Sequence, residues 1–297
     1  MEKKRVGIGQ KILLLILSLC TLICLMPMLL VIIISFTDDA SITVNGFSYF
    51  PEKLSLKGYE YVLGYGTQII DSYKVTVFIT VIGTVLALLV MSMFAYALSR
   101  KSFLIRKYLA VFMLIPMFFS GGQLASYMIN TTVYGLKDSL AVLILPMCVS
   151  TMNIIILRTY IQNNVPDSLI EAAKIDGAGD FRIYWQIVLP IMPPVLAAIG
   201  FMVAVGYWNE WQGALIYIES SSKTPLQLLL VRIENNINFL LTAKNMGSTE
   251  MAAIMKEIPQ ESGRMAILMT VLGPIMILYP FFQKYFVKGI TVGSVKG

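Results

Sequence analysis

The sequence predicts an all-α membrane protein with six transmembrane helices and both termini in the cytoplasm. Composition is the first observation: of the 297 residues, 57% are hydrophobic and 13% are charged, whereas soluble domains average about 25% charged residues. The second observation is the presence of long apolar runs, which indicate transmembrane helices because about 20 apolar residues cross a bilayer as a helix. The third is an uneven distribution of Lys and Arg between the connecting segments, which indicates their side of the membrane.

Six apolar runs make up the predicted membrane domain, residues 12–290. The spans are expected at residues 12–37, 75–99, 108–128, 139–157, 191–208 and 265–282. The first run follows a basic N-terminus, residues 1–11, and is too long for the apolar part of a signal peptide. Prolines inside the runs, such as Pro27 and Pro116, can kink a helix or interrupt its hydrogen bonds.

Orientation follows from the basic residues in the connections. Four lie in the N-terminus, four in residues 100–107, three in residues 158–190 and three after the last span, so fourteen of 23 share one side. Cytoplasmic segments carry the excess of Lys and Arg. Residues 158–190 and the tail 291–297 are therefore expected to be cytoplasmic, and residues 209–264 extracellular. The net charge of +6 is interpreted as this bias rather than as nucleic-acid binding.

The residue types that the chain lacks argue against several classes of function. The sequence has no His, no Cys/His cluster with zinc spacing and no GxxxxGK[ST] loop, so we predict no metal site, no catalytic residues and no ATPase site in this chain. Its three cysteines lie in apolar runs and are interpreted as small hydrophobic residues. The spans also lack a central Asp, Glu, Lys or Arg, which disfavours a membrane-embedded enzyme or an ion-coupled transporter.

The polar segment 166–190 carries the clearest local pattern. Ser168 and Glu171 have the spacing of a capping box, and an apolar face follows at helical spacing. The residues expected to end this helix and to cap the next are Gly177, Gly179 and Asp180. A helix lying on the membrane surface is the alternative, although such helices are usually rich in Lys and Arg rather than acidic.

The spacing of Glu171-Ala172-Ala173, Gly177 and Leu189-Pro190 resembles the EAA motif of permease subunits of ABC importers. The resemblance implies the type I ABC importer permease fold. It also implies a cytoplasmic coupling helix, about residues 168–176, that docks on a partner ATPase. The residues implied in this coupling are Glu171, Ala172, Ala173, Asp176, Gly177, Leu189 and Pro190.

The C-terminal stretch 283–297 resembles the end of the smaller, maltose-transporter-type permeases of carbohydrate importers. With Tyr279–Phe282 before it, the chain is similar to the branch for aldouronate and other polysaccharide fragments. The resemblance implies that the ATPase subunits contact the tail residues Gly293, Ser294, Val295, Lys296 and Gly297. The tail has too little apolar surface to fold alone, so its order is expected to come from a partner. The alternative is a solvated basic end that only fixes orientation.

Aromatic and polar residues after the fifth span are candidates for substrate contact. They are Tyr207, Trp208, Asn209, Glu210 and Trp211. An aromatic ring can pack on the C–H face of a sugar while amides and carboxylates bond its hydroxyls, but aromatic residues also mark membrane interfaces. Asn153 and Asn130 lie in or near apolar runs and can face the pathway or bond between helices.

The function implied by the resemblance is the permease subunit of an ABC importer that takes up oligosaccharides by alternating access. Its implied partners are a second homologous permease, two ATPase subunits that bind ATP and Mg²⁺, and an extracellular solute-binding lipoprotein. The chain would be a multi-pass protein of the bacterial plasma membrane, in contact with lipid and without a cofactor of its own. The alternatives are an importer of peptides, amino acids or phosphate, or an ion-coupled secondary transporter.

Overall fold

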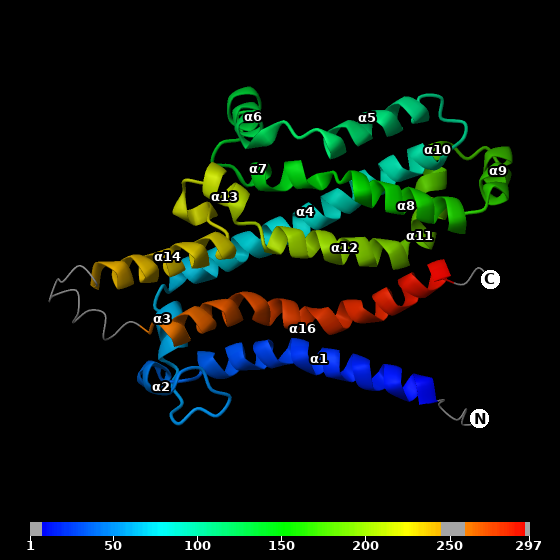
Figure 1. The fold of residues 1–297 in the computed structure, drawn as a ribbon. Coiled ribbons are helices and arrows are strands. Elements are labelled where there is room, and N and C mark those ends of the chain that lie inside the picture. The colour runs from blue at the N-terminus through cyan, green and yellow to red at the C-terminus, as the bar shows by residue number, and fades with distance from the viewer. Residues whose placement is uncertain (1–7, 245–258, 295–297) are drawn as a thin grey trace. The chain divides into compact units, whose positions relative to one another are not determined.

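The computed structural model describes residues 8–244 and 259–294, and that part of the chain is predominantly helical (Figure 1). Within these ranges the only strand-like pairing is an isolated bridge between Thr37 and Leu54, so the predicted all-α class is confirmed. The chain divides into two compact units. One comprises Met1–Gly66 and Arg232–Pro274, and the other comprises Thr67–Val231 and Ile275–Gly297.

The first unit begins with α1 (Ile8–Ser35), which covers nearly all of the first predicted span. Its side chains from residue 9 to residue 29 are all exposed in the described structure. A helix that is apolar on every side is stable only in lipid or against other protein. The length and apolar composition of α1 therefore suit a membrane crossing.

Two short helices, α2 (Asp39–Asn45) and α3 (Lys57–Leu63), follow α1 in the first unit. The carboxylate of Asp39 accepts hydrogen bonds from the backbone N–H groups of Glu261 and Ser262 at 2.9 and 3.2 Å, and from the Ser262 hydroxyl at 2.7 Å. These residues form the first turn of α16 (Glu261–Ser294). Asp39 thus satisfies N–H groups that a helix N-terminus leaves unpaired, and it ties α2 to α16.

The second unit is built around α4 (Thr67–Ser99), which runs along α8 (Thr151–Asn164) and α12 (Pro193–Trp208) (Figure 1). Small residues let these helices approach closely. A Cβ on Gly83 would lie 2.6 Å from the ring of Tyr207, and one on Gly200 would lie 3.1 Å from Leu88. Close backbone approach at Gly and Ala is typical of helix packing in membranes.

Three of the apolar segments in the second unit are bent rather than straight. α5 (Arg106–Phe118) meets α6 (Gly122–Met128) and the π-helical turn η1 (Ile129–Val133) at 116°. α7 (Leu140–Ile144) with η2 (Leu145–Cys148) meets α8 at 48°. α10 (Asp180–Ile183), η3 (Tyr184–Val188) and α11 (Leu189–Ile191) together meet α12 at 83°.

The predicted third span at residues 108–128 is broken within its length. α5 ends at Phe118, because Phe119 is extended with φ −123°, and Gly122, with φ +79°, begins α6 after the break. Two described helices are long and apolar enough to cross a membrane, and up to five spans result if each bent pair is one. The predicted second span lies inside the longer α4, which begins at Thr67. The predicted fourth span covers α7, η2 and the first half of α8, which are bent by 48° relative to one another.

The segment after the fifth predicted span is largely helical in the part that the structure describes. It contains α13 (Gln212–Tyr217), the 3₁₀ turn η4 (Ser221–Lys223) and α14 (Leu226–Lys244). α16 includes the predicted sixth span and continues to Ser294.

Asp138 fixes the start of this segment to the turn before α7. Its carboxylate accepts hydrogen bonds from the backbone N–H groups of Glu219 and Ser220, both at 3.0 Å, and from the Ser220 hydroxyl. It also forms an ion pair of 3.0 Å with Lys223. These bonds, the Ser220 hydroxyl first, hold the pKa of Asp138 well below its usual range.

Candidate functional site

The helix predicted at residues 168–176 is present as α9 (Asp167–Ile175). Its ending agrees with the prediction for Gly177, which has φ +78°. The N–H of Gly177 donates to the Lys174 carbonyl at 3.0 Å, and that of Ala178 donates to the Ala173 carbonyl at 2.9 Å. This is the bonding of a Schellman C-cap, in which a glycine takes the left-handed position.

The predicted capping residues of this segment were wrong. Pro166 occupies the N-cap of α9, without a side-chain capping bond, so Ser168 and Glu171 form no capping box. Gly179 is extended, with φ −71°, and is itself the N-cap of α10. Asp180 instead forms an ion pair with Lys174 at 3.2 Å, which joins the last turn of α9 to the first turn of α10.

The apolar residues of α9 are divided between two faces. Ile170 is buried and Ala173 packs against the core of the second unit. On the opposite side Ile175 is 87% exposed, and Leu169 and nearby Phe181 are exposed as well. The implied coupling residues Glu171, Ala172, Asp176, Gly177 and Pro190 are exposed, whereas Leu189 is half-buried against the core. Exposed apolar side chains therefore lie on α9 and shortly after it, in a place where a partner can cover them.

α9 is joined to the end of α4 by charged groups. Asp167 lies 3.3 Å from the ammonium of Lys101 and 3.7 Å from the guanidinium of Arg100. Arg100 is only 8% exposed, and it also bonds the Ser99 hydroxyl at 3.0 Å and lies over the Tyr96 ring at 5.4 Å. Because Arg100 is held on several sides, the ion pair fixes the first turn of α9 to α4.

A second connection joins α4 to the π-helical turn η3. The hydroxyls of Ser92 and Tyr184 lie 2.7 Å apart, and Tyr184 is buried. π-helical turns inside helices are rare and are frequent at functional sites. The chain from α9 through η3 therefore contacts α4 at two points before it continues into α12.

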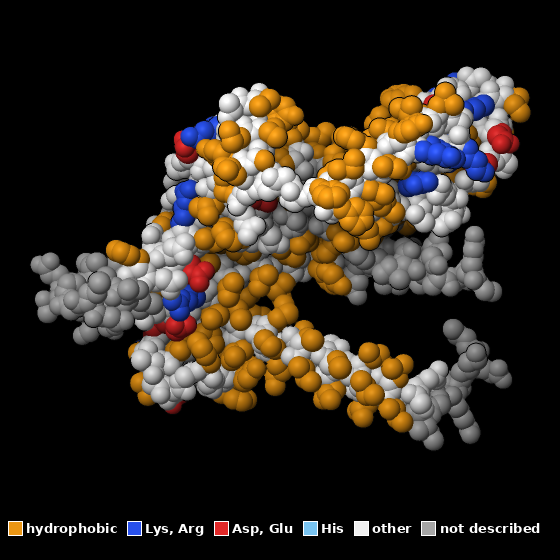
Figure 2. All heavy atoms as spheres, turned by 45° about the horizontal axis from the view of Figure 1, so that its top comes forward, with side chains coloured by type: hydrophobic (Ala, Val, Ile, Leu, Met, Phe, Trp, Pro, Cys, Tyr) orange, Lys and Arg blue, Asp and Glu red, His pale blue; other side chains and the backbone are white. Residues whose placement is uncertain are grey.

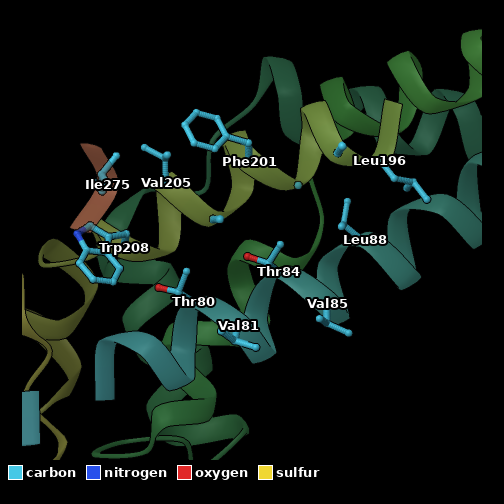
Figure 3. Close-up of a pocket in the computed structure, with 13 residues that line it drawn as sticks. Thr80, Val81, Thr84, Val85, Leu88, Leu196, Phe201, Val205, Trp208 and Ile275 are labelled. Atoms are coloured by element: carbon cyan, nitrogen blue, oxygen red, sulfur yellow. The ribbon is translucent and has the colours of Figure 1, made fainter. Parts of the chain in front are cut away.

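A cavity of about 480 Å³ lies between α4 and α12 (Figure 3). Its volume falls in the range of about 300–1,000 Å³ that is usual for small-molecule sites. Most lining side chains are apolar, including Val81, Leu88 and Phe201. Thr80 and Thr84 also line it, and their hydroxyl oxygens have no hydrogen-bond partner among the described residues, but these oxygens are enclosed and the surface of the cavity is apolar. Buried polar groups are nearly always bonded, so a water is the simplest partner for these hydroxyls.

Only one of the five residues at 207–211 lines this cavity. Trp208 does so, with its ring 6.4 Å from that of Tyr73. Tyr207 is fully buried and donates a hydrogen bond to the Ile144 carbonyl at 2.8 Å. Asn209 accepts a bond from Gln227 at 2.8 Å, Glu210 accepts one from the N–H of Gly213, and Trp211 packs against the core. The five residues are therefore not gathered on one surface.

The remaining candidates lie apart from the cavity. Asn130 donates to the Tyr217 hydroxyl at 3.2 Å, which agrees with the alternative of a bond between helices. Asn153 is half-buried in the first turn of α8, where its backbone N–H donates to Ser150. Of the tail, Gly293 and Ser294 end α16, and Val295, Lys296 and Gly297 lie outside the described residues.

Thr80 and Thr84 are not among the candidate residues predicted from the sequence. The pattern that could have indicated them is a series of three threonines, Thr76, Thr80 and Thr84, spaced four residues apart within an apolar span. Such spacing places their side chains on one helix face. Thr76 is bonded, since its hydroxyl accepts the N–H of Leu226 at 2.8 Å.

The described residues form a helical membrane protein with a cavity between α4 and α12 and, apart from the cavity, an exposed helical turn at α9. The chain belongs to the family described as binding-protein-dependent transport system inner membrane component, which residues 98–292 match. It is 37% identical over 277 residues to the polygalacturonan/rhamnogalacturonan transport system permease protein YtcP of Bacillus subtilis, covering 93% of this chain and 94% of that protein.

Two further similarities extend over nearly the whole chain. The arabinooligosaccharides transport system permease protein AraQ of Halalkalibacterium halodurans is 29% identical over 285 residues, covering 93% of this chain and 92% of that protein. A solved structure of a bacterial ABC transporter involved in the import of the acidic polysaccharide alginate includes a similar chain. The TM-score is 0.80 at 27% identity, covering 96% of this chain and all of that one.

Proposed function

We propose that this chain is the permease subunit of an ABC importer that carries oligosaccharides across the bacterial plasma membrane. The family membership supports the transport role and the inner-membrane location. The carbohydrate substrate is supported by the names of the relatives, which include transport system permeases for polygalacturonan/rhamnogalacturonan and for arabinooligosaccharides, and by the alginate importer.

The proposed assembly contains this chain, a second homologous permease, two ATPase subunits and an extracellular solute-binding lipoprotein. The ATPase subunits would bind ATP and Mg²⁺, and this chain would perform no covalent chemistry. Six spans with both termini in the cytoplasm, α16 supplying the last, agree with the distribution of Lys and Arg. The membrane domain would extend over residues 12–290.

The proposed coupling surface is the exposed side of α9 with Leu169, Ile175 and the turn at Gly177. A motion imposed on α9 by the ATPase would be transmitted to α4 through Asp167 and Arg100. It would be transmitted to α12 through η3 and α11, which follow α9 along the chain. Since α4 and α12 line the cavity, this route would couple ATP binding to opening and closing of the pathway.

The proposed sugar contacts in the cavity are Trp208 and, once a movement of α4 against α12 exposes their enclosed hydroxyls, Thr80 and Thr84. Each threonine hydroxyl can donate one hydrogen bond and accept two, which suits the hydroxyls of a sugar. The Trp208 ring offers an apolar face to sugar C–H groups. The tail, residues 293–297, is proposed to enter the ATPase dimer, and its removal should lower ATP hydrolysis stimulated by the loaded binding protein.

The observation that carries this proposal is the exposed turn of α9, joined by ion pairs to the end of α4. The test is the substitution Ile175→Asp, compared with Leu104→Asp in the connection between α4 and α5, where the side chain is 91% exposed. Ile175→Asp should reduce co-purification of the ATPase subunits strongly, and Leu104→Asp should not. Equal co-purification of both variants and the native chain would contradict docking at α9.

A further inference from the structure

A narrow crevice between α4, α5 and α8 combines an apolar interior with a half-buried arginine, Arg158. Its volume is about 70 Å³, and its lining includes Leu98 of α4, Ala110 and Leu114 of α5, and Ile155 and Arg158 of α8. The Nε of Arg158 is buried and has no hydrogen-bond partner among the described residues. A buried donor of this kind, on a charged group, is costly unless a partner from outside the chain satisfies it.

The helix directions place further positive charge at the same end of the crevice. Arg106 and Lys107 lie in the first turn of α5, one turn before Ala110, so they share its side of the helix. α5 begins at the proposed cytoplasmic side, whereas α8 runs toward it. Arg158 follows Ile155 by three residues on α8 and therefore lies nearer to that side. The deep end of the crevice carries Thr151, whose hydroxyl is satisfied by the Met113 carbonyl at 3.0 Å.

These three cations differ from their neighbours in lacking acidic partners. Arg100 and Lys101 pair with Asp167, and Lys174 pairs with Asp180. Within residues 8–244 and 259–294 no ion pair involves Arg106, Lys107 or Arg158. Figure 2 shows Lys and Arg side chains gathered at the end of the unit that carries α9. The unpaired charges therefore lie where the inner leaflet begins in the proposed topology.

Apolar space continues beyond the crevice. Leu98 also lines a larger cavity of about 410 Å³ between α4 and α5, together with Phe94, Phe103 and Leu109. A free phosphate or an acidic side chain would use the cations and leave this apolar space unfilled. A lipid would use both, because its phosphate is anionic and its acyl chains are apolar. Basic pockets between transmembrane helices on the cytoplasmic side bind anionic lipid head groups.

We infer that the α4–α5–α8 crevice binds an anionic phospholipid of the inner leaflet, with its phosphate on Arg158 and the first turn of α5. The acyl chains lie along Ala110, Leu114 and Leu98. The site rests on the proposed topology, which puts this end of the unit at the cytoplasmic face. Because Leu98 is two residues before Arg100 on α4, a bound lipid steadies the same helix end that holds α9.

The test uses the full-length chain, with any subunits that co-purify, in detergent. Retained lipids are counted by native mass spectrometry, and thermal unfolding is followed with added phosphatidylglycerol, phosphatidylcholine or inorganic phosphate. Neither readout needs ATP hydrolysis or sugar uptake, so a failure here is distinct from a failure of the proposed function. The probe variants are Arg158→Gln, Arg158→Lys and Ala110→Leu, and the matched control is Arg182→Gln on the exposed surface of α10.

Phosphatidylglycerol should stabilise the native chain more than phosphatidylcholine does, and phosphate should not reproduce the effect. Arg158→Gln should weaken phosphatidylglycerol binding by about tenfold, since one charge-assisted hydrogen bond is lost. Ala110→Leu should also weaken phosphatidylglycerol binding, because the larger side chain fills the crevice. Arg158→Lys should retain part of the native binding, and Arg182→Gln should retain all of it. Equal lipid retention by the native chain and both weakened variants, or an equal effect of phosphate, would overturn the site.

Discussion

Gly177 offers a direct test of how the α9 turn is built, because only its backbone conformation demands glycine. It has φ +78°, and a Cβ added there would meet no atom within 4 Å. The cost of a substitution is therefore conformational, about 1–2 kcal/mol for an L-residue in the left-handed region. It should be larger for Val, whose β-branch makes this region a genuine outlier, and smaller for Asn, which tolerates it.

Gly179 supplies the matched control. It also has open space around its Cβ position, but its backbone is extended, with φ −71°. Gly177→Val should lower the free energy of unfolding by about 2 kcal/mol or more and disturb ATPase coupling, whereas Gly179→Val should leave both nearly unchanged. The assays are thermal unfolding in detergent and ATP hydrolysis by the reconstituted complex. Equal behaviour of the two valine variants, or a native-like Gly177→Val, would refute the left-handed cap.

Three further predictions concern the packing, the outer clamp and the topology. Gly83→Ala should destabilise the chain by about 1–3 kcal/mol, because its Cβ would lie 2.6 Å from the buried Tyr207 ring; unchanged thermal unfolding would show that the ring can move. The lowered pKa of Asp138 means that its contribution to stability is present above its ordinary pKa of 3.8 and is lost as pH falls toward the depressed value. Asp138→Asn should then flatten the loss of stability in acid, and an unchanged pH profile would contradict the clamp. Single cysteines at Ser168 and Ser222 should be labelled from opposite sides of the membrane, and labelling from one side would overturn the six-span topology.

The sequence was most informative where local chemistry decides the structure. Long apolar runs predicted helices, because a run of about 20 apolar residues is stable in lipid as a helix. Gly177 predicted a helix end, because glycine accepts the left-handed conformation of a C-cap. The same reasoning failed at the start of α9. Ser168 and Glu171 had the spacing of a capping box, but the N-cap of α9 is Pro166, two residues before Ser168. The acidic Asp167 at the start of the helix pairs with Arg100 and Lys101 at the end of α4 instead.

Features that depend on distant parts of the chain could not be predicted from local patterns. The break after Phe118 is marked in the sequence only by Pro116 and the pair Gly121-Gly122, and residues of these types are also tolerated within membrane-spanning helices. Tyr207 looked like an interfacial aromatic residue, but Gly83 on α4 makes room for its ring in the core. The cavity that Thr80 and Thr84 line is formed by the packing of α4 against α12. These helices are distant in the sequence, so no local pattern around the two threonines could predict the cavity.

The most direct test of the central claim is uptake of a labelled oligosaccharide into proteoliposomes. The vesicles should contain this chain, its partner permease and the ATPase subunits, with ATP inside and the loaded binding protein outside. The account predicts that sugar accumulates only when both ATP and the binding protein are present, and that Ile175→Asp abolishes the accumulation while the chain remains inserted. Uptake that is independent of ATP, or that follows an ion gradient instead, would contradict it.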